Sequence, residues 1–131
     1  MILDTNYLIA LREDDDNAKT TSEELESTGL PLRLPSIVIW ELYFGVGAGT
    51  DTIGNQRSYE KLVANKPIAP LDGNLARRAG ILMGVHRASD TKPNLDPVDS
   101  IVAAAGLKYN EPVVTDDSDF EVVDGLRVES Y

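Results

Sequence analysis

The stretch VVTDDSDF, residues 113–120, places a buried strand directly before a cluster of acids. Two valines and a threonine favour an extended, buried backbone. Asp116, Asp117 and Asp119 follow within four residues, on a chain that is already strongly negative. Neighbouring carboxylates repel one another, so the end of this strand needs a compensating positive charge.

The composition restricts the class of protein. The chain has 131 residues, with 22 acidic and 12 basic side chains and no cysteine. This length fits one domain spanning residues 1–131. The lack of cysteine excludes disulfides and thiolate chemistry and favours a reducing compartment. Apolar runs such as SIVIWELYF are too short to span a membrane, and MILDTN is no secretory signal. We therefore expect a cytoplasmic protein without a membrane partner.

The formal net charge of −10 argues against a generic basic footprint for nucleic acid. It leaves two interpretations, a basic or metallic partner and a surface adapted to high salt. The scattered acids and the presence of only five lysines favour adaptation to high salt.

Apolar periodicity and turn residues predict short strands that alternate with helices. Strands are expected at residues 1–4, 32–34, 68–71, 113–115 and 126–129. Helices are expected to begin near residues 5, 17, 36, 52, 74 and 98, with Thr5 and Asn6 capping the first. Such alternation implies crossover connections and therefore a mainly parallel sheet within an α/β sandwich.

Acids follow two of the expected strands. Asp4 ends the first strand, and Asp117 and Asp119 follow the strand at 113–115. Two more acids, Glu41 and Asp99, lie on otherwise apolar helices. In parallel sheets, sites form beyond the carboxyl ends of the strands, so we expect these five carboxylates to meet at one edge.

Carboxylates gathered in this way would bind a hard divalent cation, Mg²⁺ or Mn²⁺. A metal held there can activate water against phosphorus, whereas the sequence offers no pairing for a covalent nucleophile. Phosphodiester hydrolysis fits best. The catalytic set is then Asp4, Glu41, Asp99 and Asp117, with Asp119 as a further metal ligand and with Asn6 and Thr115 hydrogen-bonding to the ligands.

Each acid also has a simpler interpretation. Asp4 could only cap a helix, and Glu41 could face solvent. Asp96 is expected to cap the helix that carries Asp99. One member of the cluster at 116–119 should form a local turn, and as ligands we rank these acids in the order Asp117, Asp119, Asp116.

Other side chains have weaker claims to a functional role. His86 is expected to be a core or surface histidine. Core or dimer-interface positions are expected for Trp40, Tyr43 and Phe44. The candidates for phosphate contacts are Arg12, Arg77, Arg78, Arg87 and Lys92.

Four segments, ILDTN, SIVIWELYFG, LDPVDSIVAAAGL and VVTDDSDFEVVDGLRV, resemble in that order a PIN domain of the VapC-like toxin ribonucleases. The resemblance runs essentially from end to end. It implies a three-layer α/β/α sandwich, Mg²⁺- or Mn²⁺-dependent endoribonuclease activity on RNA, a homodimer and a VapB-like antitoxin in a type II toxin–antitoxin pair. The positions that match the family's acids are Asp4, Glu41, Asp99, Asp117 and Asp119, while Asp116 stands where the family often has a basic residue.

Two other functions stay open. One is a Mg²⁺-dependent phosphomonoesterase with Asp4 as nucleophile, although Asn6 stands where such enzymes carry a second aspartate. The other is a non-catalytic module whose acids bind a basic partner or a structural ion.

Overall fold

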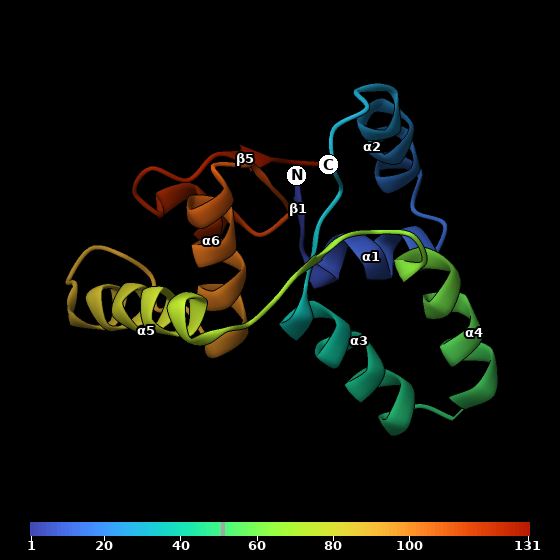
Figure 1. Ribbon diagram of the computed structural model, residues 1–131, viewed down its shortest axis with the longest axis horizontal. Helices are drawn as coiled ribbons and strands as arrows, with labels where there is room; N and C mark the ends of the chain where they lie inside the picture. The colour runs from blue at the N-terminus through green and yellow to red at the C-terminus, as the bar shows by residue number, and fades with distance from the viewer. Residues whose placement is uncertain (51) are drawn as a thin grey trace.

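Short parallel strands run through the middle of the molecule in the computed structural model, which describes residues 1–50 and 52–131 (Figure 1). The strands are β1 (Ile2–Leu3), β2 (Leu34–Pro35), β3 (Ile68–Ala69), β4 (Val113–Val114) and β5 (Val128–Glu129). Strand β4 lies between β1 and β5, and β2 pairs with β3. A parallel bridge between Ile2 and Arg33 joins the two sets, so the strand order is 3-2-1-4-5.

Helices fill the connections between the strands. They are α1 (Thr5–Arg12), α2 (Asp16–Ser27), α3 (Ser36–Ala48), α4 (Thr52–Val63), α5 (Gly73–Ala88) and α6 (Pro97–Tyr109), followed by the 3-10 helix η1 (Ser118–Val122). Figure 1 shows α5 and α6 grouped on one side of β1, and α1 to α4 on the other. No helix among the described residues is long and apolar enough to span a membrane.

Aspartates start several of these helices, as the sequence predicts. Asp72 accepts a hydrogen bond from the amide of Leu75 at 2.8 Å, and Asp96 accepts one from the amide of Asp99 at 2.8 Å. Such contacts satisfy amide groups that have no partner inside the helix. Asp96 thereby takes the capping role expected of it and leaves the Asp99 side chain free of that role.

The predicted mixed α/β fold with a short parallel sheet is confirmed, while several details differ. The strands are shorter than expected, and β2 includes Pro35, which was expected to follow the strand. The cap of α1 is Asp4, not Thr5 or Asn6. Helix η1 was not predicted, because its five residues are too few to show a helical period.

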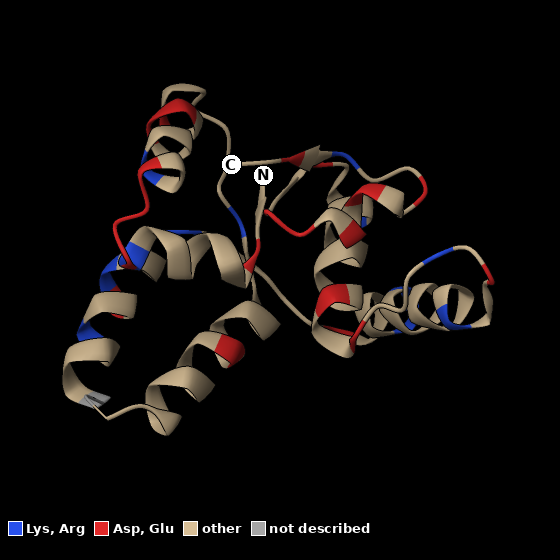
Figure 2. Ribbon diagram, turned by 180° about the vertical axis from the view of Figure 1, so that it is seen from behind, with Lys and Arg blue, Asp and Glu red and all other residues tan. Residues whose placement is uncertain are grey.

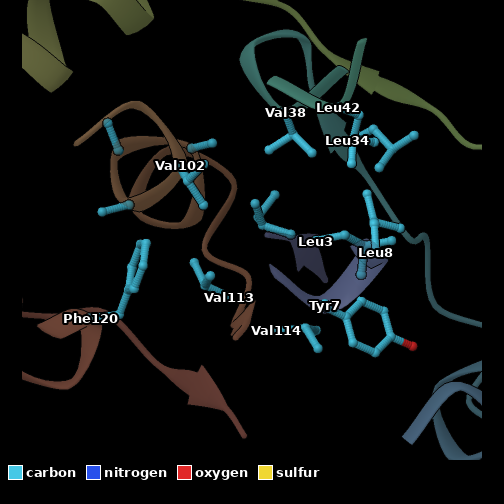
Figure 3. Packing of buried hydrophobic residues seen from close by; sticks show 14 of the residues in the cluster. Leu3, Tyr7, Leu8, Leu34, Val38, Leu42, Val102, Val113, Val114 and Phe120 are labelled. Atoms are coloured by element: carbon cyan, nitrogen blue, oxygen red, sulfur yellow. The ribbon is translucent and has the colours of Figure 1, made fainter. Parts of the chain in front are cut away.

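The core lies on both faces of the central strands. Figure 3 shows Val102 and Phe120 on one side of Leu3 and Val114, and Tyr7 on the other. All of these side chains are buried. Since each fully buried apolar side chain of this size contributes about 1.5–3 kcal/mol, this packing fixes the ends of β1 and β4 firmly.

The chain reverses its direction of winding between β1 and β4. From β1 the sheet grows to β2 and β3, and from β4 it grows the other way to β5. At such a switch point the connections diverge and leave a crevice beyond the carboxyl ends of the two strands. The residues that follow these strands are Asp4 and Thr115.

Helix α6 packs against the sheet through small residues. Ala103, Ala104 and Ala105 are buried, and Gly106 follows them. A Cβ atom on Gly106 would lie 2.5 Å from Cδ1 of Leu126 and 3.0 Å from Cγ2 of Val113. The glycine therefore sets the distance between α6 and β4.

We predict that Gly106→Ala lowers the free energy of unfolding by about 1–3 kcal/mol through overpacking. Gly80→Ala, in the middle of α5 where an added Cβ meets nothing within 4 Å, should instead raise it by about 0.5–1 kcal/mol. Urea unfolding of both variants measures the two effects. Equal stabilities for the two variants would contradict the close approach of α6.

Candidate functional site

Asp4 occupies the carboxyl end of β1 and is only 3% exposed. Its Oδ1 accepts a hydrogen bond from the amide of Thr5 at 2.8 Å, and its Oδ2 accepts one from Oγ1 of Thr115 at 2.7 Å. Asp4 thus caps α1 and is also tied to the end of the neighbouring strand β4. The expected contact between Thr115 and an acid of the site is present.

The segment after β4 is held by a relay of hydrogen bonds. The amide of Asp117 donates to Oγ1 of Thr115 at 3.1 Å, and the amide of Asp119 donates to Oδ1 of Asp117 at 2.9 Å. Asp117 therefore caps η1 and is the acid of this cluster that makes the local turn. Asp117 also lies close enough to Asp4 for the two carboxylates to repel each other. It can therefore cap η1 and still belong to the acidic site.

Burial and repulsion oppose the charge on Asp4. The pKa of Asp4 rises to about 6, first because the carboxylate is buried, and further because Glu41 and Asp117 repel it. The hydrogen bonds from Thr115 and Thr5 act in the opposite direction. A buried anion with two acidic neighbours is one that a cation would stabilise.

Burial and repulsion also oppose the charge on Asp99, which lies in the first turn of α6. Its pKa rises to about 7, first through burial and then through repulsion by Asp96, Asp4, Asp117 and Glu41. Four separate elements thus bring acids together, and Figure 2 shows red segments on α3, at the start of α6 and where the chain leaves β1 and β4. Asp119 contacts this cluster through its backbone amide, which donates to Oδ1 of Asp117.

The acids form a loose cluster. Within residues 1–50 and 52–131, no three of them are close enough to one another to surround a single ion directly. Mg²⁺ usually keeps several of its waters and binds one or two carboxylates. A donor set made only of oxygens, with the buried Asp4 and the half-buried Asp99 both raised in pKa, fits an ion of this kind. Asp4 and Asp99 could hold such an ion, and Glu41 and Asp117 are the other acids that lie near both of them.

Asn6 does not join the cluster as expected. Its Nδ2 donates to Oδ1 of Asp116 at 3.2 Å, and this contact is exposed. Tyr131, which was not singled out in the sequence, lies near the same carboxylate and near Asp4; burial, followed by these two charges, raises the pKa of its hydroxyl. The parallel register of β4 and β5 was the feature that could have revealed Tyr131, since it aligns Val114 with Glu129.

Other expected residues lie away from the acids. His86 is buried, and its Nδ1 lies 3.0 Å from the carbonyl oxygen of Pro93, as expected for a core histidine. A core position for Trp40 and Phe44 is wrong, because they are 58% and 65% exposed and stack on each other. Tyr43 is partly buried.

Three of the cations expected to contact phosphate, Arg12, Arg78 and Lys92, contact other side chains. Arg12 donates to Asn55 and lies over the ring of Tyr59. Lys92 pairs with Asp124 at 2.6 Å. Among the described residues, the main influences on the pKa values of Asp4 and Asp99 beside burial are neighbouring carboxylates and, for Asp4, two hydrogen bonds; none of these main influences is a basic side chain. A cation from solution is therefore the natural counter-charge.

We predict that Asp99→Asn stabilises the metal-free protein at pH 8 by on the order of 1 kcal/mol, because repulsion is relieved. A carboxylate whose pKa rises on folding binds more protons when folded, so its contribution to stability falls as pH rises from about 4 through 7. Urea unfolding in EDTA at pH 5 and pH 8 should show a smaller fall in the variant. The exposed Asp90→Asn serves as control, and equal falls in Asp99→Asn and the wild type would contradict the prediction.

Comparison with known proteins identifies the family and the fold. The family model of the PIN domain matches residues 1–126. No curated protein matches the chain in sequence. Among solved structures, VapBC2 from Rickettsia felis bound to a promoter DNA fragment is similar, with 19% identity and a TM-score of 0.85 over 98% of this chain and 96% of that one.

Two further structures share the fold. DNA-bound VapBC from Salmonella typhimurium has 22% identity and a TM-score of 0.84, covering 98% of this chain and 96% of that one. VapC20 of Mycobacterium tuberculosis, a toxin that cleaves the sarcin-ricin loop, has 15% identity and a TM-score of 0.72 over 97% of each chain. Identities this low establish the fold. Together with the match over residues 1–126, they show that this chain belongs to the PIN domain family.

Proposed function

We propose that this protein is a Mg²⁺- or Mn²⁺-dependent endoribonuclease that acts as the toxin of a type II toxin–antitoxin pair. The observation that carries the proposal is the gathering of Asp4, Glu41, Asp99 and Asp117 from four elements, close enough to repel one another at the switch point of a parallel sheet. Membership of the PIN domain family and structural similarity to VapC-type toxins support it.

Each acid has a defined task in the proposed mechanism. A bound Mg²⁺ or Mn²⁺ would supply Lewis acidity and lower the pKa of an attacking water. Asp4 and Asp99 would hold the ion, which would favour the charged form of both carboxylates. Thr115 keeps Oδ2 of Asp4 in one orientation, through the 2.7 Å hydrogen bond.

Glu41 and Asp117, which lie near both of these acids, would orient water in the site. Glu41 approaches from α3, and Asp117 approaches from the end of β4, where its Oδ1 is fixed by the amide of Asp119. Either carboxylate can accept a proton from water while the phosphodiester is hydrolysed. Asp119 contributes its backbone amide to this arrangement, and we propose it as an outer ligand only.

Exposed apolar residues support the proposed partners. Trp40 and Phe44 form a stacked pair on α3, and Ile81 on α5 is 70% exposed. Large exposed apolar side chains commonly mark surfaces that another protein covers. The structures of VapBC2 and of DNA-bound VapBC, both similar to this chain, contain such toxin–antitoxin pairs. A homodimer neutralised by a VapB-like antitoxin is therefore part of the proposal.

The phosphomonoesterase alternative gains no support from the geometry. Such an enzyme needs a second polar side chain beside Asp4, and the residue at that position is Asn6. The Asn6 side chain instead donates to Asp116. We therefore retain phosphodiester hydrolysis as the proposed reaction.

The test is cleavage of a mixed pool of structured and single-stranded RNAs by purified protein in EDTA, Mg²⁺ or Mn²⁺. We expect fragments only with metal, and a loss of about 10²-fold or more in Asp99→Asn and Asp4→Asn. Asp90→Asn, an exposed acid outside the cluster, should cleave like the wild type. Circular dichroism checks the fold of Asp4→Asn, which loses one accepted hydrogen bond.

Other results would redirect the assignment. Undiminished cleavage in both variants, or cleavage in EDTA, would remove the proposed mechanism. Turnover of a small phosphate monoester without RNA cleavage would favour the phosphomonoesterase. Tight metal binding without hydrolysis of either substrate would make the acids a binding module.

A further inference from the structure

We infer that Trp40 and Phe44 form a stacking platform for an unpaired base of the RNA substrate, beside the acids that would hold the metal. The inference deepens the proposed function and rests on it for the identity of the substrate. It assigns a role in binding to two aromatic side chains whose rings lie outside the core, at 58% and 65% exposure.

The two rings already form a stack. The ring centroids of Trp40 and Phe44 lie 5.7 Å apart, and the ring planes are inclined by 29°. Bases of single-stranded RNA stack on exposed aromatic rings, and this contact tolerates any base because every base has a π face. Since the rings support each other before RNA arrives, less side-chain freedom is lost when a base joins the stack.

Helix α3, which carries the platform, starts beside the acidic site. Its first residue, Ser36, follows β2 directly, and β2 lies next to β1 through the bridge between Ile2 and Arg33. Asp4 follows β1 at the same edge of the sheet. Helix α3 also contacts α1, which Asp4 caps, and α6, which carries Asp99. The start of the platform helix is therefore fixed at the site.

Glu41 connects the platform with the site. The buried side chains of α3 are Val38, Leu42 and Val46. At about 100° per residue, Glu41 falls at the edge of this buried side, and Trp40 and Phe44 fall on the outer side. Phe44 follows Glu41 by three positions, which places their Cβ atoms about 5–6 Å apart. Because Glu41 also lies near Asp4 and Asp99, a strand that passes these acids can set a neighbouring base on the platform.

The charge of the protein favours stacking over contacts with phosphate. The formal net charge is −10, and Glu41 is the only charged residue in the sequence SIVIWELYFGVGA of α3. Arg12, Arg78 and Lys92 contact other side chains. A base stacked on an aromatic ring raises affinity about 5- to 150-fold and needs no positive charge. Stacking is therefore a source of RNA affinity that suits this acidic surface.

The platform is also part of the exposed apolar surface that supports a protein partner. A base and a protein side chain cannot occupy the same ring faces at once, so a partner bound here would block RNA. The test therefore uses the protein purified without a partner and follows its oligomeric state by sedimentation velocity.

The first measurement is intrinsic fluorescence, because Trp40 is the single tryptophan of the chain. The wild type, in EDTA and in Ca²⁺, is titrated with single-stranded RNA of about 10 nucleotides, an abasic oligomer of equal length and the same RNA as a duplex. We expect saturable quenching by the single strand, none by the abasic oligomer and little by the duplex, whose bases already stack on one another. No quenching by the single strand in either buffer, or equal quenching by the abasic oligomer, would overturn the inference.

The second measurement is the anisotropy of labelled single-stranded RNA titrated with variants. Trp40→Leu and Phe44→Leu should bind about 5-fold or more weakly than the wild type, and Trp40→Phe, which keeps an aromatic ring, within about threefold of it. Ile81→Ala removes a similarly exposed apolar side chain from α5 and is the control. Wild-type affinity in Trp40→Leu, or an equal fall in Ile81→Ala, would contradict the platform.

The results also separate the platform from the proposed function. Metal-dependent cleavage with undiminished RNA affinity in Trp40→Leu would leave the proposed function standing and overturn the platform. Quenching of Trp40 by single-stranded RNA that the protein does not cleave with any metal would support the platform and remove the nuclease. A changed sedimentation coefficient in Trp40→Leu, with no quenching of the wild type by RNA, would make the pair a protein contact and overturn the inference.

Discussion

Asp4 carries a carboxylate that is almost fully buried, and the rest of the site depends on how that charge is accommodated. The amide of Thr5 and the hydroxyl of Thr115 offset part of the cost of burial. Glu41, Asp117 and Asp99 add to the cost, because each places another negative charge nearby. Without a cation, the folded protein relieves this repulsion only by binding protons, which explains why the pKa values of Asp4 and Asp99 rise.

The fold determines which acids meet. The reversal of winding between β1 and β4 opens the sheet where Asp4 and Thr115 end their strands. The small residues of α6 let this helix approach β4 closely, and its first turn then brings Asp99 to the same edge. Helix α3 begins directly after β2 and carries Glu41 from a third direction. Stability of the packed core therefore supports a site that is itself unfavourable without a positive charge.

Much of this site could be predicted from the sequence, because strand ends and buried acids follow simple rules. Asp4 and Asp117 follow strands, and sites in parallel sheets form beyond the carboxyl ends of the strands. Glu41 and Asp99 were singled out because their neighbours in the sequence are apolar. The orientation of Asn6 could not be predicted, since it depends on a side-chain rotamer and on the position of Asp116. The position of Tyr131 depends on the register of β4 and β5, in which Val114 pairs with Glu129, 15 residues further along the chain. Trp40 and Phe44 belong to a helix that is apolar on nearly every face, so its pattern did not show which side is exposed.

The most direct test of the central claim, that the acids of the site bind one divalent cation together, is Mn²⁺ calorimetry in buffers of different ionisation enthalpy. With pKa values of about 6 for Asp4 and about 7 for Asp99, binding at pH 6.5 should release about one proton per ion. The release should fall towards zero at pH 8.5, where both acids are already charged. Binding without proton release at pH 6.5, or no binding of Mn²⁺ at either pH, would contradict the account.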